Sequence, residues 1–320
     1  MDSHHDHHSA AIVLAGGDGV RLSSMTREIF GYALPKQFLP LFKGETLLEQ
    51  TLCRVSLVVP RARTITVLNR AHERFYSPLL TGVEPRNLLI QPANRGTAPA
   101  IMSPLMRLTE AGHTGAVAIF PSDHYVSDDS EFMRQVAMAF AEVEFSPRLI
   151  VLLGIAPDGP KSGYGWIEPG APVTPADCIF GRIAPICRFW EKPSPEVASR
   201  LFGCGCLWNS FILVANVERL QSLVAKALPE LYTAFTRVRH SLGTAREKGA
   251  LETVYSGLPS LNFSERVLSE FSSELSVLPI TGVEWSDLGE PARLLAVMSS
   301  KGIRPEWLDR LQVSAQLEGR

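Results

Sequence analysis

Short apolar runs recur through the first half of the chain and alternate with helix-like segments. The runs are almost continuous in Ile, Val, Leu and Ala, which is typical of strands buried on both faces of a sheet. The alternation therefore predicts an α/β fold with a mixed, mostly parallel central sheet. The predicted strands are residues 11–16, 64–69, 87–92, 116–121 and 149–155, and the predicted helices lie near 46–58, 71–80, 98–111 and 130–144.

The pattern changes after about residue 155, where longer strand-like segments are joined by Gly and Pro turns. A strand at 207–215, a helical stretch at about 217–256, a strand within 273–280 and a helix at 291–300 follow. No tandem repeat separates the parts. We expect one α/β domain at 11–300, made of a first half (about 11–155) and a second half (about 156–300), with a His-rich leader at 1–10 and a C-terminal tail at 301–320.

Composition narrows the class of protein. The chain has 320 residues, 45% of them hydrophobic and 20% charged, with a formal net charge of −2. This balance argues against a broad nucleic-acid-binding surface. The longest apolar run, which begins at Leu149, is too short to span a bilayer. We therefore expect a cytoplasmic protein with neither nucleic acid nor membrane as a partner. The five cysteines show no C-x-x-C spacing, and we expect them to be reduced and mostly buried in the core.

A glycine-rich loop directly follows the first predicted strand, in the stretch AIVLAGGDGVRL. Gly16, Gly17 and Gly19 permit backbone N–H groups to approach an anion closely, and Arg21 adds a guanidinium suited to phosphate oxygens. The loop does not have the glycine spacing of the dinucleotide-binding fingerprint, and no P-loop lysine follows Gly19. The alternative is an ordinary turn between a strand and a helix.

Several further motifs occur in a fixed order along the chain: LPKQFLPL, QPANRGTAPAI, FPSDHYV, GYGWIEPG, FWEKPS, LWNSF and GVEWSDLGEP. Together with the glycine loop, they resemble those of the sugar-1-phosphate nucleotidyltransferases over residues 11–296. The resemblance implies a Rossmann-like, GT-A-like three-layer fold and makes residues 11–300 a nucleotidyltransferase domain. Its first half (about 11–155) would bind the nucleotide, and its second half (about 156–300) would bind the sugar phosphate. It also implies a Mg²⁺-dependent reaction in which a sugar 1-phosphate attacks the α-phosphorus of a nucleoside triphosphate and pyrophosphate leaves.

Within that family, the motifs are most similar to those of members that use GTP and mannose 1-phosphate to form GDP-mannose. Two alternatives remain open. One is the same chemistry with another sugar 1-phosphate or another base, and the other is a non-catalytic regulatory homologue that binds a sugar nucleotide. The sequence does not decide the assembly state, for which a homodimer is one possibility.

The reaction needs charge neutralisation more than a nucleophilic side chain, because the attacking phosphate is already an anion. The resemblance places Arg21 and Lys36 against the triphosphate and the leaving pyrophosphate. It places Asp123 and Asp287 as ligands of Mg²⁺, a hard cation that prefers oxygen. The alternative for Asp123 is a turn aspartate. The alternative for Asp287 is a helix N-cap, with Glu290 as its capping-box partner.

The resemblance also assigns substrate contacts. Those to the nucleotide are Ala15, Gly16, Gly17, Gly19, Gln91, Asn94, Gly96 and Thr97, and those to the sugar phosphate are Gly165, Glu191, Lys192 and Asn209. Thr97 as a plain helix N-cap is an equally acceptable interpretation. We expect Asp128 and Asp129 to begin a helix, His124 to be structural, and the segment between Arg21 and Lys36 to be a loop.

Overall fold

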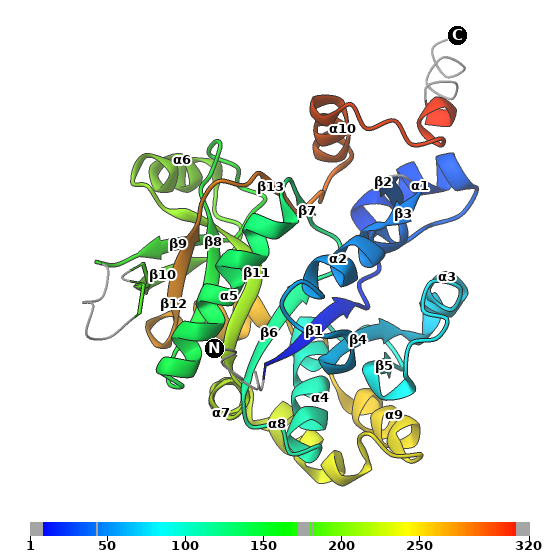
Figure 1. Cartoon of the computed structure of the whole chain (residues 1–320), viewed down its shortest axis with the longest axis vertical. Coiled ribbons are helices and arrows are strands. Elements are labelled where there is room, and N and C mark those ends of the chain that lie inside the picture. Colours follow the sequence, from blue (N-terminus) through cyan, green and yellow to red (C-terminus); the bar gives the residue numbers. More distant parts are fainter. Residues whose placement is uncertain (1–8, 43, 172–178, 181, 312–320) are drawn as a thin grey trace, which may run out of the picture.

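The computed structural model describes residues 9–42, 44–171, 179–180 and 182–311. Within these residues, a nine-stranded sheet in the order β5-β4-β1-β6-β11-β8-β12-β10-β9 forms the centre of the molecule (Figure 1). Its strands are β1 (Ala10–Ala15), β4 (Thr64–Asn69), β5 (Leu88–Gln91), β6 (Ala116–Pro121), β8 (Ile150–Ile155), β9 (Trp166–Pro169), β10 (Ala184–Trp190), β11 (Leu207–Asn216) and β12 (Ser276–Ile280). One sheet thus runs through both predicted halves.

The first four strands of this sheet pair in parallel and reverse their order at one place. The chain moves outward from β1 to β4 and β5, then returns through α4 (Thr97–Glu110) to β6, on the other side of β1. In open α/β sheets, ligands bind beyond the carboxyl ends of the strands where the order reverses. The loops after β1 and β6 therefore flank the expected binding position.

The second part of the sheet is mixed. β11 runs antiparallel to β6, β8 and β9, whereas β12 runs parallel to β8 and antiparallel to β10. The prediction of an α/β fold with a mixed sheet is confirmed. A mostly parallel sheet is not, because the reversed strands β10 and β11 pair antiparallel with each of their neighbours.

Helices cover both faces of the sheet, and each face has its own apolar core. One core includes residues of α2 (Leu47–Val55), α5 (Asp129–Phe145) and α10 (Pro291–Lys301). The other includes residues of α4, α7 (Val217–Ala227), α8 (Pro229–Val238) and α9 (Glu247–Gly257). Alternation along β1 sends Val13 to the first core and Ile12 to the second. The result is a three-layer arrangement.

Shorter elements surround these layers. The segment between Arg21 and Lys36, expected as a loop, forms helix α1 (Ser23–Phe30), which buries Met25 and Ile29. The helix expected near 71–80 is shorter, because a 3₁₀ turn (Arg70–His72) leads into α3 (Glu73–Tyr76). The remaining elements are β2 (Pro40–Phe42), β3 (Glu45–Thr46), β7 (Tyr125–Val126), α6 (Pro195–Gly203) and β13 (Trp285–Ser286).

The predicted boundaries shift slightly at both ends. Ala10, expected in the leader, is a buried residue of β1, and residues 1–8 lie outside the described part of the chain. Part of the predicted tail is packed, since Trp307 is buried and its indole N–H donates to the carbonyl oxygen of Pro40 at 2.7 Å. The domain around residues 11–300 thus gains contacts from residues beyond it.

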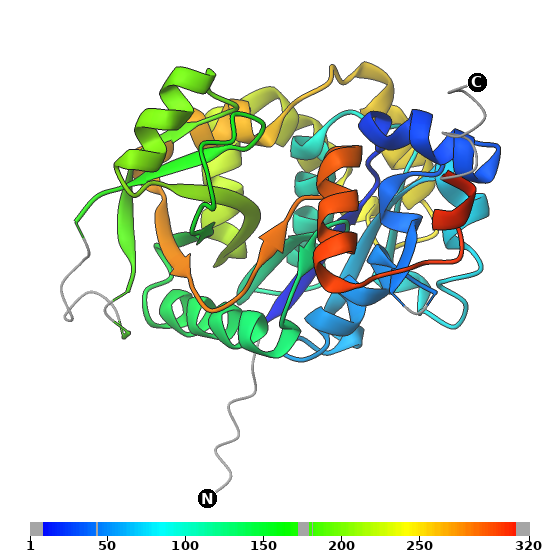
Figure 2. The same cartoon turned by 90° about the horizontal axis from the view of Figure 1, so that it is seen from above.

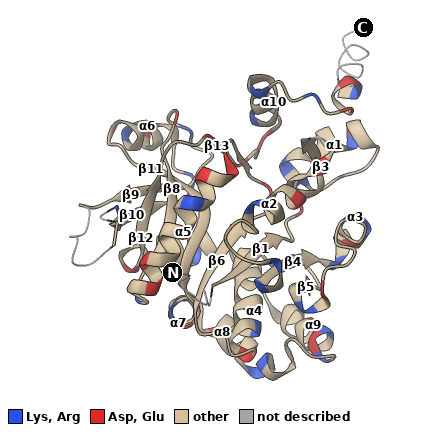
Figure 3. Cartoon of the chain, viewed as in Figure 1, with Lys and Arg blue, Asp and Glu red and all other residues tan. Residues whose placement is uncertain are grey.

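The cysteine prediction is only partly right. Cys53, Cys187 and Cys204 are exposed free thiols, so they are not core fillers, whereas Cys206 is buried. Cys178 lies outside the described residues. Acidic and basic residues are interspersed along the helices and strands (Figure 3). Among the described residues, no helix combines the length and apolar character needed to cross a membrane.

Candidate active site

A cavity of about 350 Å³ lies at the carboxyl ends of β1 and β6, between the two halves of the sheet. The view in Figure 2 shows α10 between the blue N-terminal elements and the strands of the second half. The cavity gathers residues that were predicted from separate motifs: Gly17, Arg21, Thr97, Asp123, Gly165, Glu191, Lys192, Asn209 and Asp287. The other predicted site residues do not line the cavity themselves: Ala15, Gly16, Gly19, Lys36, Gln91, Asn94 and Gly96.

Lys36 joins the two predicted metal ligands. It lies in a 3₁₀ turn (Lys36–Phe38) after Pro35 and is buried. Its ammonium is 2.9 Å from Oδ2 of Asp123 and also donates to the backbone carbonyl of Asp287. The ends of β6 and β13, far apart in sequence, are therefore held by one positive charge.

Asp287 sits in a tight turn between β13 and α10. Its Oδ1 accepts from the backbone N–H of Gly289 at 2.9 Å and from Nη1 of Arg293 at 2.7 Å. Its Oδ2 lies 3.8 Å from Nη2 of Arg21. Burial opposes ionisation of this carboxyl, but the charges of Lys36 and Arg293 contribute to an overall lowering of its pKa. The carboxylate is therefore ionised at neutral pH.

The capping alternative for Asp287 is excluded. The N-cap of α10 is Glu290, which makes no side-chain capping bond, and Pro291 occupies the first helical position. The carboxylate of Asp287 instead accepts from the backbone N–H of Gly289 in the turn and from the guanidinium of Arg293. By contrast, Asp128 does cap α5, since it accepts from the N–H of Glu131 at 2.9 Å.

Asp123 follows β6, directly after Ser122, whose hydroxyl donates to the carbonyl of Leu14 at 2.8 Å and fixes the end of β6 against β1. The neighbouring His124 packs edge-on against Trp285, with ring centroids 5.1 Å apart. Burial, with a contribution from the charge of Lys36, lowers the pKa of His124 to about 4. A neutral, buried ring suits the predicted structural role of this histidine.

The donor set around Lys36 suits a hard divalent cation. Mg²⁺ is commonly held by one or two carboxylates together with substrate phosphates and water. Asp123 supplies a carboxylate 2.9 Å from the ammonium, and Asp287, whose backbone carbonyl accepts from the same ammonium, supplies a second carboxylate. No group of three or more His, Cys, Asp or Glu side chains suited to a metal occurs in the described part of the chain. Two carboxylates beside a cavity are a donor set of the kind that Mg²⁺ uses together with phosphate oxygens and water.

The glycine loop packs against Lys36 and Gln37 on its side facing the protein interior. Gly19 has φ +61°, and a Cβ there would lie 2.8 Å from the backbone nitrogen of Lys36. Gln37 donates its side-chain amide to the carbonyls of Ala15 (3.0 Å) and Gly17 (2.8 Å). Gln37 stands next to Lys36 in the motif, yet no sequence signal indicates its supporting role.

Gln91, predicted to touch the nucleotide, is buried beneath this loop. Its amide nitrogen lies 2.5 Å from the position that a Cβ of Gly16 would take. Its Oε1 accepts from the hydroxyl of Tyr255 at 2.8 Å. Gln91 therefore supports Gly16 from within the protein, on the side away from solvent.

A polar chain links the glycine loop to the start of α4. The carboxylate of Asp18 accepts from Asn94 at 2.8 Å and lies 3.2 Å from Nε2 of His72. Asn94 in turn accepts from the N–H of Gly96 at 3.0 Å. Gly96, with φ +84°, is the N-cap of α4, and a side chain there would collide with the carbonyl of Leu261.

Thr97 is the first residue of α4 and not its N-cap, so the capping interpretation is wrong. Its hydroxyl accepts from the N–H of Phe263 at 2.8 Å, which ties the start of α4 to the segment after α9. Thr97 nevertheless lines the cavity. The first N–H groups of this 14-residue helix have no partner within the helix, as at any helix start.

The predicted sugar-phosphate residues cluster on the opposite wall. Gly165 lies so close to its neighbours that a Cβ would be 3.3 Å from Oε2 of Glu191 and 3.4 Å from Cβ of Asn209. Its carbonyl accepts from the N–H of Asn209 at 2.8 Å. Lys192 pairs with Glu191 at 3.1 Å. The absence of a side chain at Gly165 therefore lets Glu191 and Asn209 pack closely against its backbone.

Backbone strain is concentrated around this cavity. Among the described residues, Lys192, Phe211 and Leu288 are the non-glycine residues with positive φ, at 45°, 59° and 47°. Lys192 and Phe211 line the cavity, and Leu288 follows Asp287. Residues held in sparsely populated conformations cluster at functional sites in proteins. Their position here favours a functional role for this cavity.

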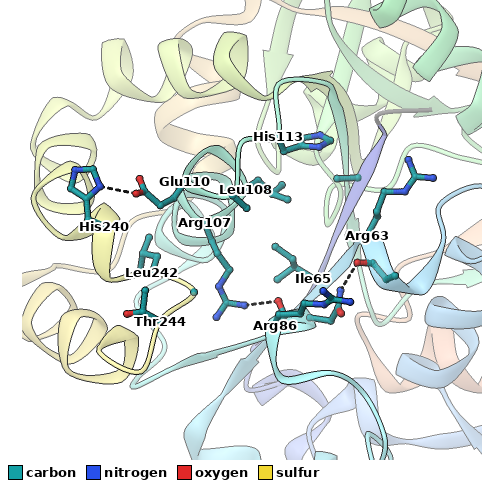
Figure 4. Close-up of a pocket in the computed structure, with 15 residues that line it drawn as sticks. Arg63, Ile65, Arg86, Arg107, Leu108, Glu110, His113, His240, Leu242 and Thr244 are labelled. Atoms are coloured by element: carbon teal, nitrogen blue, oxygen red, sulfur yellow. Dashed lines mark hydrogen bonds and ion pairs between the residues drawn. The ribbon is translucent and has the colours of Figure 1, made fainter. Parts of the chain in front are cut away.

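A second cavity of about 490 Å³ lies at the other end of the parallel strands, near the starts of β1, β4 and β5 (Figure 4). None of the sequence-predicted site residues lines it. Its charged groups largely satisfy one another: Arg107 pairs with Glu247 and donates to the carbonyls of Arg86 and Leu88, and His240 pairs with Glu110. The motif residues and the residues with positive φ therefore favour the 350 Å³ cavity at the carboxyl ends of β1 and β6 as the functional site.

Comparisons with known proteins identify the family of this chain. Residues 10–301 match the family model described as nucleotidyl transferase. Xanthan biosynthesis protein XanB of Xanthomonas campestris pv. campestris (strain B100) is 31% identical over 299 residues, and mannose-1-phosphate guanylyltransferase of Escherichia coli is 26% identical over 295 residues. Each alignment covers 91% of this chain and 60% of the relative, so the chain spans about 60% of the length of these relatives.

Solved structures share the fold. A crystal structure from Thermus thermophilus, described as a mannose-1-phosphate geranyltransferase, has a TM-score of 0.76 and 31% identity, and the match covers 91% of this chain and 79% of that one. The inositol-1-phosphate CTP transferase of T. maritima, at 16% identity and a TM-score of 0.54, agrees in fold alone over 92% of this chain and 95% of that one.

Proposed function

Because the chain belongs to the nucleotidyl transferase family, we propose that it transfers a guanylyl group from GTP to α-D-mannose 1-phosphate, forming GDP-mannose and pyrophosphate. The observation that carries this proposal is the contact of Lys36 with Asp123 and with the backbone of Asp287 at the switch point of the sheet. Relatives named mannose-1-phosphate guanylyltransferase support the choice of substrates.

The main obstacle to this reaction is the repulsion between two anions. The sugar phosphate must approach the α-phosphorus of a polyanion, and its oxygen needs no general base because it already carries negative charge. Arg21 and Lys36 would bind the triphosphate and stabilise the charge that passes to pyrophosphate. Lys36 is buried, so its charge is little screened by water and acts at short range.

Asp123 and Asp287 would hold the Mg²⁺ ion, which supplies further charge neutralisation and orients phosphate oxygens when bound. The contribution of the protein is to fix these carboxylates in advance. Asp123 is placed by the end of β6, and Asp287 by the strained turn at Leu288 and by Arg293. Groups fixed before the reaction need no reorganisation during it.

The nucleotide would bind along the glycine loop and the start of α4. Gly17 is exposed to the cavity, while Gln37 and Gln91 hold the loop from beneath. Anions bind favourably at helix N-termini, where N–H groups lack partners within the helix. Thr97 begins that helix and lines the cavity.

The sugar phosphate would bind on the wall formed by Gly165, Glu191, Lys192 and Asn209. The carboxylate of Glu191 and the amide of Asn209 are groups that hydrogen-bond sugar hydroxyls. The side chain of Lys192 is 57% exposed, so its ammonium can meet a phosphate. Gly165 packs against both Glu191 and Asn209, so the small residue keeps these two polar side chains together on the cavity wall.

Pyrophosphate release tests the proposal. The purified chain is mixed with GTP, ATP or UTP, with mannose 1-phosphate or glucose 1-phosphate, and with or without Mg²⁺. We expect the fastest release with GTP, mannose 1-phosphate and Mg²⁺. A faster reaction with another pair would support the same chemistry on other substrates. Absence of turnover with every pair would favour a regulatory homologue that binds a sugar nucleotide.

A further inference from the structure

Each predicted metal ligand already has a positively charged partner. Asp123 is paired with Lys36 at 2.9 Å, and Asp287 is paired with Arg293 at 2.7 Å and borders Arg21 at 3.8 Å. The two carboxylates thus face the cationic groups of one lysine and two arginines. Since Arg293 also pairs with a third carboxylate, the cations balance the carboxylates and leave no net negative charge for a divalent ion.

Arg293 is fixed in place from several sides. Its side chain is 14% exposed, and its guanidinium lies 4.3 Å from the centroid of the Tyr164 ring. Besides Asp287, it pairs with Glu290 at 3.2 Å. A Cβ on Gly163 would collide with Nη2 of Arg293, so the absence of a side chain there makes room for the guanidinium. Arg293 is therefore a built part of this site and not a surface arginine.

The bond to Arg293 limits what Asp287 can offer. Its Oδ1 is occupied by Arg293 and by the N–H of Gly289. Oδ2 is left to face Arg21 and the cavity. A divalent cation approaching Oδ2 would meet attraction from the two carboxylates and repulsion from the lysine and both arginines. A polyanion bound at the same time would reverse this balance.

We propose that Arg293 is a positioning residue that holds Asp287 through Oδ1 and, by its charge, keeps a divalent cation from binding tightly between Asp123 and Asp287 before a polyphosphate arrives. This inference rests on the proposed metal-binding role of the two aspartates. Arg293 lies in α10, two residues beyond the end of the last motif, so no sequence pattern indicates this role.

Mn²⁺ binding to the full chain, measured by electron paramagnetic resonance without nucleotide, tests the proposal. We expect weak binding in the unsubstituted protein and an affinity about tenfold higher in Arg293→Met, because one repulsive charge is removed. Arg293→Lys retains the charge and should stay close to the unsubstituted protein. Lys301→Met removes a charge from the end of the same helix, where Lys301 pairs with Glu284, and should leave Mn²⁺ affinity unchanged.

Added inorganic tripolyphosphate supplies the polyanion. It should increase Mn²⁺ binding to the unsubstituted protein and reduce the difference from Arg293→Met. In an Asp287→Asn background, one of the two carboxylates is lost, so the Arg293→Met change should raise Mn²⁺ affinity by much less than tenfold. An undiminished tenfold effect in that background would show that Arg293 does not act through Asp287, and would overturn the inference.

Equal or weaker Mn²⁺ binding in Arg293→Met, in a protein that circular dichroism shows to be folded, would also overturn the proposal, since it would leave Arg293 a merely structural role. Should Arg293→Met fail to fold, Arg293→Gln removes the same charge and replaces it in the comparison. None of these readouts requires turnover. A protein that fails the pyrophosphate assay but shows the expected Mn²⁺ pattern would refute the proposed reaction and keep this inference.

Discussion

The ammonium of Lys36 lies 2.9 Å from Oδ2 of Asp123, although the two residues belong to separate motifs that lie far apart in the sequence. The lysine is buried, and its backbone nitrogen lies directly against Gly19. The glycine loop, the lysine and the end of β6 thus form one packed unit. A substitution in any of these three parts should therefore alter the position or the charge of the others.

Lys36→Met should lower kcat for pyrophosphate release by about 10²- to 10³-fold, because it removes a preorganised positive charge from a shielded site. Lys36→Arg should recover part of the activity, since it restores the charge with a different shape. Lys226→Met removes a surface lysine that pairs with Glu274 and serves as the control. Equal activity of Lys36→Met and the control would contradict the role assigned to Lys36.

Asp123→Asn should abolish turnover while the fold remains intact. The change keeps the shape of the side chain and removes the charge that a Mg²⁺ ligand needs. The change also leaves the buried ammonium of Lys36 without its charged partner, so the free energy of unfolding should fall although the protein still folds. The pyrophosphate assay and thermal unfolding measure the two effects. Asp158→Asn, which removes an exposed ion pair with Lys161, is the matched control. Retained activity in Asp123→Asn would refute the assignment of Asp123 as a metal ligand.

Arg21→Ala should raise KM for the triphosphate by about tenfold and change kcat less, because one charge-assisted contact to phosphate is lost. Its side chain is 53% exposed, so the variant should unfold at nearly the same temperature. Arg27→Ala, on the exposed face of α1, removes a neighbouring arginine outside the cavity. If both variants bind GTP with unchanged affinity in calorimetry, Arg21 does not contribute to binding of the triphosphate.

Gly19→Ala should destabilise the folded protein by about 2 kcal/mol, because a left-handed conformation is unfavourable for alanine. Its methyl group would also press against the backbone of Lys36 and displace the lysine, so activity should fall as well. Gly17→Ala is the matched control, since a Cβ there meets no neighbouring atom within 4 Å and its φ is not positive. Chemical denaturation of both variants provides the measurement, and equal stability would argue against the strain.

His72 should make the protein less stable in mild acid. Burial lowers the pKa of His72 below its usual value, and the charge of Asp18 only partly opposes the effect. The unfolded chain therefore binds a proton more readily than the folded protein, so the free energy of unfolding falls as the pH drops below about 6.5. In His72→Gln, the decline between about pH 7 and pH 5 should be shallower.

The control for this pH dependence is His240→Gln, because His240 is largely exposed and pairs with Glu110 at the surface. Its denaturation curves should follow those of the unsubstituted protein across the same pH range. If His72→Gln and the unsubstituted protein lose stability in parallel, protonation of His72 is not the cause of the decline.

Much of the fold could be predicted because the strands are buried on both faces. Continuous apolar runs located β1, β4, β5, β6 and β8 close to their observed ends. The predicted α4 and α5 also match closely. The helix α1 was missed because its short apolar face, with Met25 and Ile29, produces only a weak periodic signal in eight residues.

The sequence by itself determined which chemical groups are present and in what order, because glycine loops, prolines and strand ends carry local signals that survive without knowledge of the fold. Tertiary structure alone decided their partners. Nothing local shows that Lys36 meets Asp123, that Gln91 is buried under Gly16, or that Arg293 takes one oxygen of Asp287. These contacts arise from the strand order and from α10 packing back onto the site, and a contact between distant segments depends on the position of both.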